Sequence, residues 1–112
     1  MANAIAQKLQ GIEESMNMSG REIAKVLRTT PETISRWRTG KSDPQPRMRD
    51  GLLHLHWLAT QLAELYPPQD AHLWLFSYHK MLDGHRAVDL IESGQGERVL
   101  QVIAQLKDGA YT

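Results

Sequence analysis

The segment SGREIAKVLRTTPETISRWRTG, residues 19–40, predicts two short helices joined by a tight turn. Ser19 stands where a residue would cap the first helix, and Glu22, three residues later, completes a capping box. Thr30 stands at the cap of the second helix, and Pro31 takes its first position because no amide hydrogen is needed there. The segment therefore predicts a helix-turn-helix, and the rest of the chain is interpreted around it.

The second predicted helix has one apolar side and one polar side. Ile34 and Trp37 are three residues apart, so they share the buried edge of the helix. Gly40 follows the last turn, where a left-handed residue commonly ends a helix. The other positions carry carboxylate, hydroxyl and guanidinium groups: Glu32, Thr33, Ser35, Arg36 and Arg38. A short helix with this distribution of side chains fits the major groove of DNA.

The polar side supplies the candidate DNA-binding residues. Arg36 can pair with guanine and Glu32 can accept a hydrogen bond from cytosine, while the first amides of the helix can hold a phosphate. Each of these side chains, taken alone, is equally compatible with a solvated helix surface. The full predicted set is Arg21, Arg28, Thr30, Glu32, Thr33, Ser35, Arg36, Arg38 and Lys41.

Charge is unevenly distributed along the 112 residues, although the whole chain has a net charge of zero. Residues 21–49 contain eight basic and three acidic side chains, a net charge of +5, whereas residues 50–112 contain four basic and eight acidic ones, a net charge of −4. The basic part can neutralise phosphates. The acidic part should avoid DNA and suits a basic protein surface.

The composition excludes several classes of protein. There is no Cys, which rules out disulfides and Cys-ligated zinc, and no apolar run approaches the ~18 residues of a membrane span. The five His residues lack the i,i+4 pairing of a helical metal site, and no nucleophile elbow, phosphate loop or paired-carboxylate motif is present. We therefore expect a cytoplasmic protein that is not an enzyme and that uses no metal or cofactor.

Apolar periodicity predicts helices outside the helix-turn-helix. Residues 2–16 form an amphipathic pattern, and residues 48–66 form the longest pattern, with apolar side chains around most of the circumference. A helix of that kind is buried on more than one side. Its second apolar side is either the contact of a homodimer or part of a larger monomer core, and the sequence favours neither. The apolar run 71–76 suits a strand or a short helix, and its helical surroundings favour a helix.

A break in the helical pattern divides the chain. Residues 41–49, KSDPQPRMR, contain two prolines that are expected to stop any helix. We predict an all-α fold with a DNA-binding part, residues 1–46, and a helical part, residues 47–112. The final helix is expected to begin at Gly96 and to end before a tail that Gly109 releases.

The run EIAKVLRTTPETISRWRTGKSDP resembles the helix-turn-helix of the Xre/Cro class of regulators. The matching core positions are Ala24, Thr30, Ile34, Trp37 and Gly40. Gly20 departs from the class, which often has a phosphate-binding Gln there, and Arg28 stands where the class often has the turn Gly. Arg28 is therefore expected to adopt a positive φ, at a cost of about 1 kcal/mol.

The run LDGHRAVDLIESGQGERVLQVIAQL, residues 82–106, resembles the toxin-binding domain of the Xre/MbcA/ParS-type antitoxins, most closely the MbcA-like branch. The matching positions are Gly84, Asp89, Leu90, Gly94, Gly96, Glu97, Arg98 and Val99. Ala87 departs from the family, which often has Pro there, and His85 replaces the usual second Gly of the first turn.

This resemblance implies an antitoxin that binds and inhibits a RES-domain toxin, an enzyme that consumes NAD, and that represses its own operon by binding operator DNA. A homodimer is expected because one recognition helix reads too few base pairs to be specific alone. The family also implies that this dimer is part of a larger toxin–antitoxin complex. The C-terminal tail is expected to block the active site of the toxin. The toxin-binding residues that the resemblance implies are Arg98, Lys107, Gly109, Ala110, Tyr111 and Thr112.

Two other functions remain open from the sequence. The chain could be an ordinary Xre-like repressor whose C-terminal half only dimerises or senses a ligand. It could also be an interaction protein whose helix-turn-helix has lost DNA binding, which the zero net charge would suit.

Overall fold

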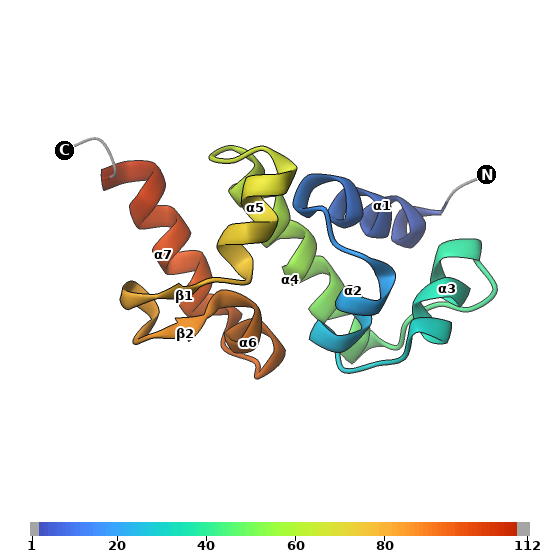
Figure 1. The fold of residues 1–112 in the computed structure, drawn as a ribbon. Coiled ribbons are helices and arrows are strands. Elements are labelled where there is room, and N and C mark those ends of the chain that lie inside the picture. The colour runs from blue at the N-terminus through green and yellow to red at the C-terminus, as the bar shows by residue number, and fades with distance from the viewer. Residues whose placement is uncertain (1–2, 110–112) are drawn as a thin grey trace.

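The computed structural model describes residues 3–109, which form seven α-helices, one 3-10 turn and a two-stranded hairpin (Figure 1). The elements of the N-terminal half are α1 (Ala4–Met16), α2 (Gly20–Val26), α3 (Pro31–Thr39) and α4 (Pro46–Ala63). They are followed by α5 (Pro68–Leu75), β1 (Tyr78–His79), η1 (Lys80–Leu82), β2 (His85–Arg86), α6 (Ala87–Glu92) and α7 (Gly96–Gly109). The predicted all-α fold is confirmed apart from the hairpin.

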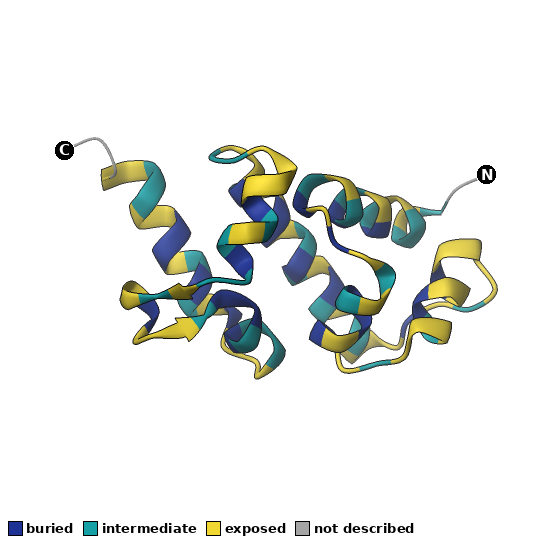
Figure 2. Ribbon diagram, in the orientation of Figure 1, coloured by how far each residue is buried: buried dark blue, intermediate teal, exposed yellow. Residues whose placement is uncertain are grey.

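The molecule is elongated, with extents of 47 × 25 × 21 Å. Figure 1 places α3 near one end of the long axis and the C-terminal end of α7 near the other, with α4 running between them. The two segments that the sequence assigns to DNA and to a partner protein therefore lie at opposite ends. Buried residues concentrate on the elements between these ends, whereas much of α3 is exposed (Figure 2).

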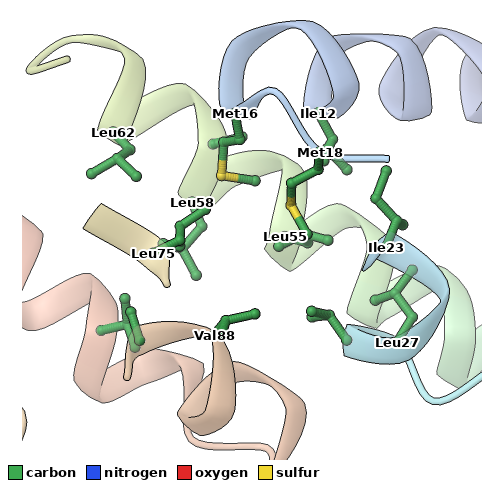
Figure 3. Close-up of a cluster of buried hydrophobic side chains, with 14 of the residues drawn as sticks. Ile12, Met16, Met18, Ile23, Leu27, Leu55, Leu58, Leu62, Leu75 and Val88 are labelled. Carbon is green, nitrogen blue, oxygen red and sulfur yellow. The ribbon is translucent and has the colours of Figure 1, made fainter. Parts of the chain in front are cut away.

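Helix α4 is the element on which both halves pack. Its buried side chains are Leu52, Leu55, Leu58, Ala59 and Leu62. Figure 3 shows side chains from α1, α2, α5 and α6 gathered around this helix, among them Met16, Leu27 and Val88. One continuous hydrophobic core thus joins the N-terminal and C-terminal halves. The division at residue 46 stays a prediction about function.

The start of α4 differs from the prediction. The helix begins at Pro46, inside the segment that was expected to be a break, because Pro46 occupies the first helical position. Its fixed φ suits that position, and its missing amide hydrogen costs nothing there. The expectation that both prolines stop a helix is therefore wrong for Pro46. At the other end, Glu64 caps α4, so the helix is shorter there than the predicted end at residue 66.

The apolar side chains of α4 belong mostly to the monomer core. Leu58 is fully buried, and Leu65 is half-buried. Leu53 and Trp57 remain 40% and 53% exposed. The second apolar side of α4 is therefore real but smaller than the sequence pattern indicates.

The hairpin is the feature that periodicity missed. Its strands pair antiparallel, Tyr78 with Arg86 and His79 with His85. Asp83 and Gly84 both adopt positive φ, 57° and 82°, which reverses the chain between the two strands. Strands of two residues have no detectable alternation, so the sequence could not reveal them. The run at residues 71–76 is helical as predicted, and it buries Ala71 and Leu75 in α5.

Within the described part of the chain, no helix combines the length and the hydropathy that crossing a membrane requires.

Candidate nucleic-acid interface and C-terminal surface

The capping box of α2 forms as the sequence predicts. The Ser19 amide donates to Glu22 Oε1 at 2.9 Å, and the Glu22 amide donates to Ser19 Oγ at 3.1 Å. Ile23 and Ala24 are buried beneath this turn. The cap fixes the start of α2, and the buried face fixes its rotation against the core.

The predicted cap of α3 is also confirmed. The Thr33 amide donates to Thr30 Oγ1 at 3.2 Å, and the hydroxyl oxygens of the two threonines lie 2.9 Å apart. Ile34 is fully buried and Trp37 is 3% exposed, so they anchor the inner side of the helix. The two threonine hydroxyls and the Thr33 amide serve the cap, and the Ile34 amide donates to the Thr30 carbonyl at 3.1 Å. Because Pro31 has no amide hydrogen, Glu32 supplies the one amide of this turn that remains for a phosphate within residues 3–109.

The outer side of α3 is open to solvent, as predicted. Glu32, Ser35, Arg36 and Arg38 are exposed, and Thr33 is half-buried. Gly40 ends the helix in the left-handed region with φ 78°. The arrangement can present carboxylate, hydroxyl and guanidinium groups together to the edges of bases.

Arg28 lies in the turn between α2 and α3 with φ 61°, which confirms the positive φ expected there. Its amide donates to the Lys25 carbonyl at 3.1 Å, and the Thr29 amide donates to the Ala24 carbonyl at 2.8 Å. These bonds hold the strained turn closed. The side chain of Arg28 is exposed and adds a positive charge at the turn.

The cations of this end fall into two groups. Arg21, Arg36 and Lys41 are exposed, and their side chains have no hydrogen bond or ion pair within residues 3–109. Arg38 instead forms an ion pair with Glu13 of α1. Its guanidinium also lies over Gly20, where an added Cβ would come within 3.2 Å of Nη2. Four predicted DNA-binding cations, Arg28 included, are therefore available, and the fifth is tied to α1.

A contact between a histidine and a carboxylate connects the two halves of the molecule. His72 Nε2 of α5 lies 3.1 Å from Glu22 Oε2 of α2, and the imidazole ring stacks on Phe76 at 4.3 Å. Burial alone would raise the pKa of Glu22, yet the hydrogen bonds from the Ser19 amide and from His72 together hold that pKa below its usual value. The same carboxylate thus caps α2 and contacts the C-terminal half.

Ion pairs also account for much of the C-terminal signature. Arg86 donates two hydrogen bonds to Asp89, at 2.8 and 2.9 Å, so that the pKa of the carboxyl group falls and the pKa of the guanidinium rises. Arg98 donates to Asp83 at 2.6 Å and to Gln95 at 3.0 Å. Arg98, which the resemblance implies in toxin binding, therefore joins the start of α7 to the turn after η1.

Lys107 is likewise engaged at the other end of α7. Its Nζ lies 2.6 Å from Gln61 Oε1 and 2.9 Å from Glu64 Oε1, both near the end of α4. Nine residues separate Lys107 from Arg98, about 14 Å along a helix. The described toxin-binding candidates are thus spread over α7 instead of forming one cluster. Gly109 is the last residue of α7, and Ala110, Tyr111 and Thr112 lie outside the described residues.

A hollow of about 680 Å³ separates parts of the two halves. Its walls come from α2, the start of α4, the end of α6 and the start of α7, and both Arg28 and Arg47 line it. His54 also lines it, and the Nε2 atom of His54 is buried without a hydrogen-bond partner in the described structure. Among residues 3–109 no three His, Asp or Glu side chains are grouped so that they could hold a metal ion.

Sequence reasoning missed the residues that hold the two ends in place. Glu13 and His72 contact residues 25 and 50 positions away, and no local pattern reports such pairings. It also missed a set of exposed apolar side chains in the C-terminal half: Leu73, Tyr78 and Met81, which are 66%, 73% and 52% exposed. An apolar residue on the outer side of a short helix or hairpin has no distinctive sequence signal.

Known proteins resemble the chain over nearly its whole length, although no family model matches it. The mycobacterial cidal antitoxin MbcA of Mycobacterium tuberculosis is 28% identical over 109 residues, 97% of this chain and 96% of MbcA, and the same values hold for MbcA of Mycobacterium bovis. A second M. tuberculosis protein, "Probable mycobacterial cidal antitoxin Rv3188", is 32% identical over 90 residues, 80% of this chain and 76% of that protein.

A solved structure agrees with these relatives. The fold matches a chain in the crystal structure of the M. tuberculosis MbcT–MbcA toxin–antitoxin complex with a TM-score of 0.85 and 28% identity, covering 98% of this chain and 99% of that chain.

Proposed function

This chain belongs to the family of mycobacterial cidal antitoxins, as its resemblance to the MbcA-like branch predicted, and we propose from this premise that it binds and inhibits a partner toxin. The observation that carries the proposal is the agreement of sequence and fold over almost the entire chain with an antitoxin solved together with its toxin. The toxin is a RES-domain enzyme that consumes NAD. The antitoxin itself is a cytoplasmic protein without catalytic activity.

The C-terminal tail inhibits the toxin by filling its active site. Lys107 binds Gln61 and Glu64, so these contacts fix the position of the end of α7 relative to the end of α4. Tyr111 brings a flat ring with a polar tip, which suits a nucleotide cleft. Arg98 fixes the start of α7 through Asp83 and Gln95, Lys107 fixes its end on α4, and the residues after Lys107 enter the toxin.

Truncation tests this mechanism. The chain that ends at Asp108 is expressed beside the toxin gene, and cellular NAD is measured together with co-purification of the toxin. We expect NAD to fall as it does without antitoxin, while the truncated chain still co-purifies with the toxin. A full-length Gln105→Ala variant, at an exposed position of α7 before the tail, is the matched control and should protect NAD. Protection by the truncated chain at equal expression would refute the role of the tail.

The α3 end binds operator DNA and represses the operon of the pair. Support comes from the exposed polar side of α3 and from the available cations Arg21, Arg36 and Lys41. One recognition helix reads too few base pairs to be specific alone, so the DNA-binding unit is a homodimer within a larger complex with the toxin. An electrophoretic mobility shift of the promoter fragment of this chain's own operon tests this part. The affinity should fall steeply as the salt concentration rises, because phosphate contacts release counterions.

The hollow between the halves favours one alternative function. A cavity of about 680 Å³ lined by Arg28 of the turn and by α6 could hold a small ligand that changes the position of the helix-turn-helix. The chain would then be an Xre-like repressor without a toxin. Purification together with the product of the neighbouring gene distinguishes the two, since a ligand-sensing repressor would bring down no second chain.

A further inference from the structure

Helix α4 carries a row of exposed side chains opposite its buried side. Arg49, Leu53, Trp57, Thr60 and Glu64 follow one another at spacings of four, four, three and four residues, which keeps them on one side of an α-helix. All five are exposed, although Leu53 and Trp57 are large and apolar. We call this row the α4 outer stripe. The monomer core does not use it, so its apolar centre needs another explanation.

Neighbouring helices border the stripe on two sides. On one side His56 lies against α1, where a Cβ added at Gly11 would come within 3.3 Å of His56 Nε2. On the other side Gln61 binds Lys107 of α7. A hollow of about 330 Å³ lies beside Trp57, with walls that include Leu100, Ala104 and Lys107. The stripe is therefore an exposed apolar strip between α1 and α7, with room for a side chain beside the indole ring.

The charges at the ends of the stripe oppose the dipole of α4. The first turn contains no acidic residue and the last turn no basic residue. Instead, Arg47 and Arg49 lie near the N-terminus and Glu64 lies at the C-terminal cap. Cations at a helix N-terminus and anions at its C-terminus are unfavourable for an isolated helix. An antiparallel second helix would bring a carboxylate to the N-terminal end and a guanidinium to the C-terminal end.

We propose that the α4 outer stripe binds a second copy of this chain, with the two α4 helices antiparallel. Residues 49 and 64 are equally distant from the midpoint between residues 56 and 57, as are residues 53 and 60. One two-fold axis at that midpoint therefore places Arg49 opposite the partner's Glu64, and Leu53 opposite the partner's Thr60. The two Trp57 rings lie beside the axis, next to the hollow.

The charge pattern favours a second copy of this chain over the toxin as the partner of the stripe. A two-fold interface must be complementary to itself, and the stripe is basic at one end, apolar in the centre and acidic at the other. A parallel pair would place like charges together. Contact with the toxin would demand no such symmetry. The inference rests on the proposed homodimer and adds to it the surface and the direction of pairing.

Sedimentation equilibrium of the full chain, free of DNA and toxin, tests the surface. Trp57→Glu should raise the dimer dissociation constant on the order of tenfold or more, since a central aromatic residue becomes a buried charge in the interface. Leu73→Glu is the matched control, because Leu73 is a 66% exposed leucine on α5 and should leave the constant unchanged. A wild-type chain that stays monomeric, or a Trp57→Glu chain that dimerises normally, would overturn the inference.

Charge reversal tests the direction. Arg49→Glu alone should weaken the dimer, and Arg49→Glu combined with Glu64→Arg should restore it. The second change also removes the contact with Lys107, and loss of that contact cannot by itself cause restoration. A double variant no better than the single one excludes the antiparallel pairing. If the Trp57→Glu chain stays dimeric but no longer co-purifies with the toxin, the stripe binds the toxin and not a second copy of the chain. That result would overturn the inference and leave the proposed function unchanged.

Discussion

The two ends of the molecule use their motif residues differently. At the α3 end the motif positions form caps and a buried edge, and the side chains between them, such as Arg36, stay open to solvent. At the α7 end the charged motif residues themselves are used internally, since Arg86 binds Asp89 and Arg98 binds Asp83. A motif can thus mark contact residues in one region and scaffold residues in another. Only the structure separates the two cases.

The largest expected effect on stability comes from a substitution in the buried edge of α3. Trp37 is 3% exposed, so Trp37→Ala should lower the free energy of unfolding by about 3–5 kcal/mol. Chemical denaturation followed by circular dichroism measures this change. Because a single core joins the two halves, both ends should unfold together. Two separate transitions would show that the halves fold independently.

The next effect separates the two ends by function. Arg36→Ala should weaken binding to operator DNA by about 1–3 kcal/mol and relax the preference at one base pair. The toxin should still be neutralised, because Arg36 is exposed and has no side-chain partner in the described residues. Electrophoretic mobility shifts with base-substituted operators measure both changes. Glu14→Ala, an exposed residue of α1, is the control. Unchanged affinity and preference would remove Arg36 from the DNA-binding set.

A smaller effect tests the scaffold role of the C-terminal signature. Arg86 lowers the pKa of Asp89 in the folded chain, so the ionised carboxylate stabilises the fold above its unfolded pKa, and this contribution is lost as the pH falls through the folded pKa. Asp89→Asn should lower the free energy of unfolding by up to about 1 kcal/mol at neutral pH, because the pair is partly exposed. The difference from wild type should shrink as the pH falls below the ordinary carboxyl pKa of 3.8 and through the lower pKa of the folded chain. A constant difference at every pH would contradict the ion pair.

The smallest effect concerns the contact of α4 with α1. Burial and the nearby Lys8 lower the pKa of His56 in the folded chain below its ordinary value of 6.5. As the pH falls through 6.5, His56 therefore binds a proton more readily in the unfolded chain than in the folded chain, which destabilises the fold. The wild-type chain should therefore lose stability between neutral and mildly acidic pH, and His56→Gln should lose less. Thermal melts across that range measure the difference. Identical slopes would show that His56 does not contribute.

The sequence predicts the α3 end better than the α7 end because its geometry is local. Ser19 and Glu22 form a cap three residues apart, and Arg28 needs a positive φ because of its place in a turn. The start of α4 at Pro46 depends on which of two prolines takes the first helical position. A periodic apolar pattern does not contain that choice.

The contacts that fix both ends were beyond the reach of the sequence. The sequence predicts that Arg38 faces DNA with Arg36, and the structure ties it to Glu13. The family resemblance assigns Lys107 to the toxin, and its partners in the structure are Gln61 and Glu64. Long side chains choose among several partners that only the folded chain brings near. Residue type and spacing gave the correct elements and left these pairings open.

The central claim is that the end of the molecule with α3 binds operator DNA and that the end with α7 binds and inhibits the toxin. Cellular NAD during expression of the toxin tests it most directly, with antitoxin variants matched for expression and folding. We predict that Arg36→Ala protects NAD as well as wild type does, and that the chain ending at Asp108 fails to protect it while still shifting operator DNA. Loss of NAD with Arg36→Ala, or protection by the truncated chain, would contradict the account.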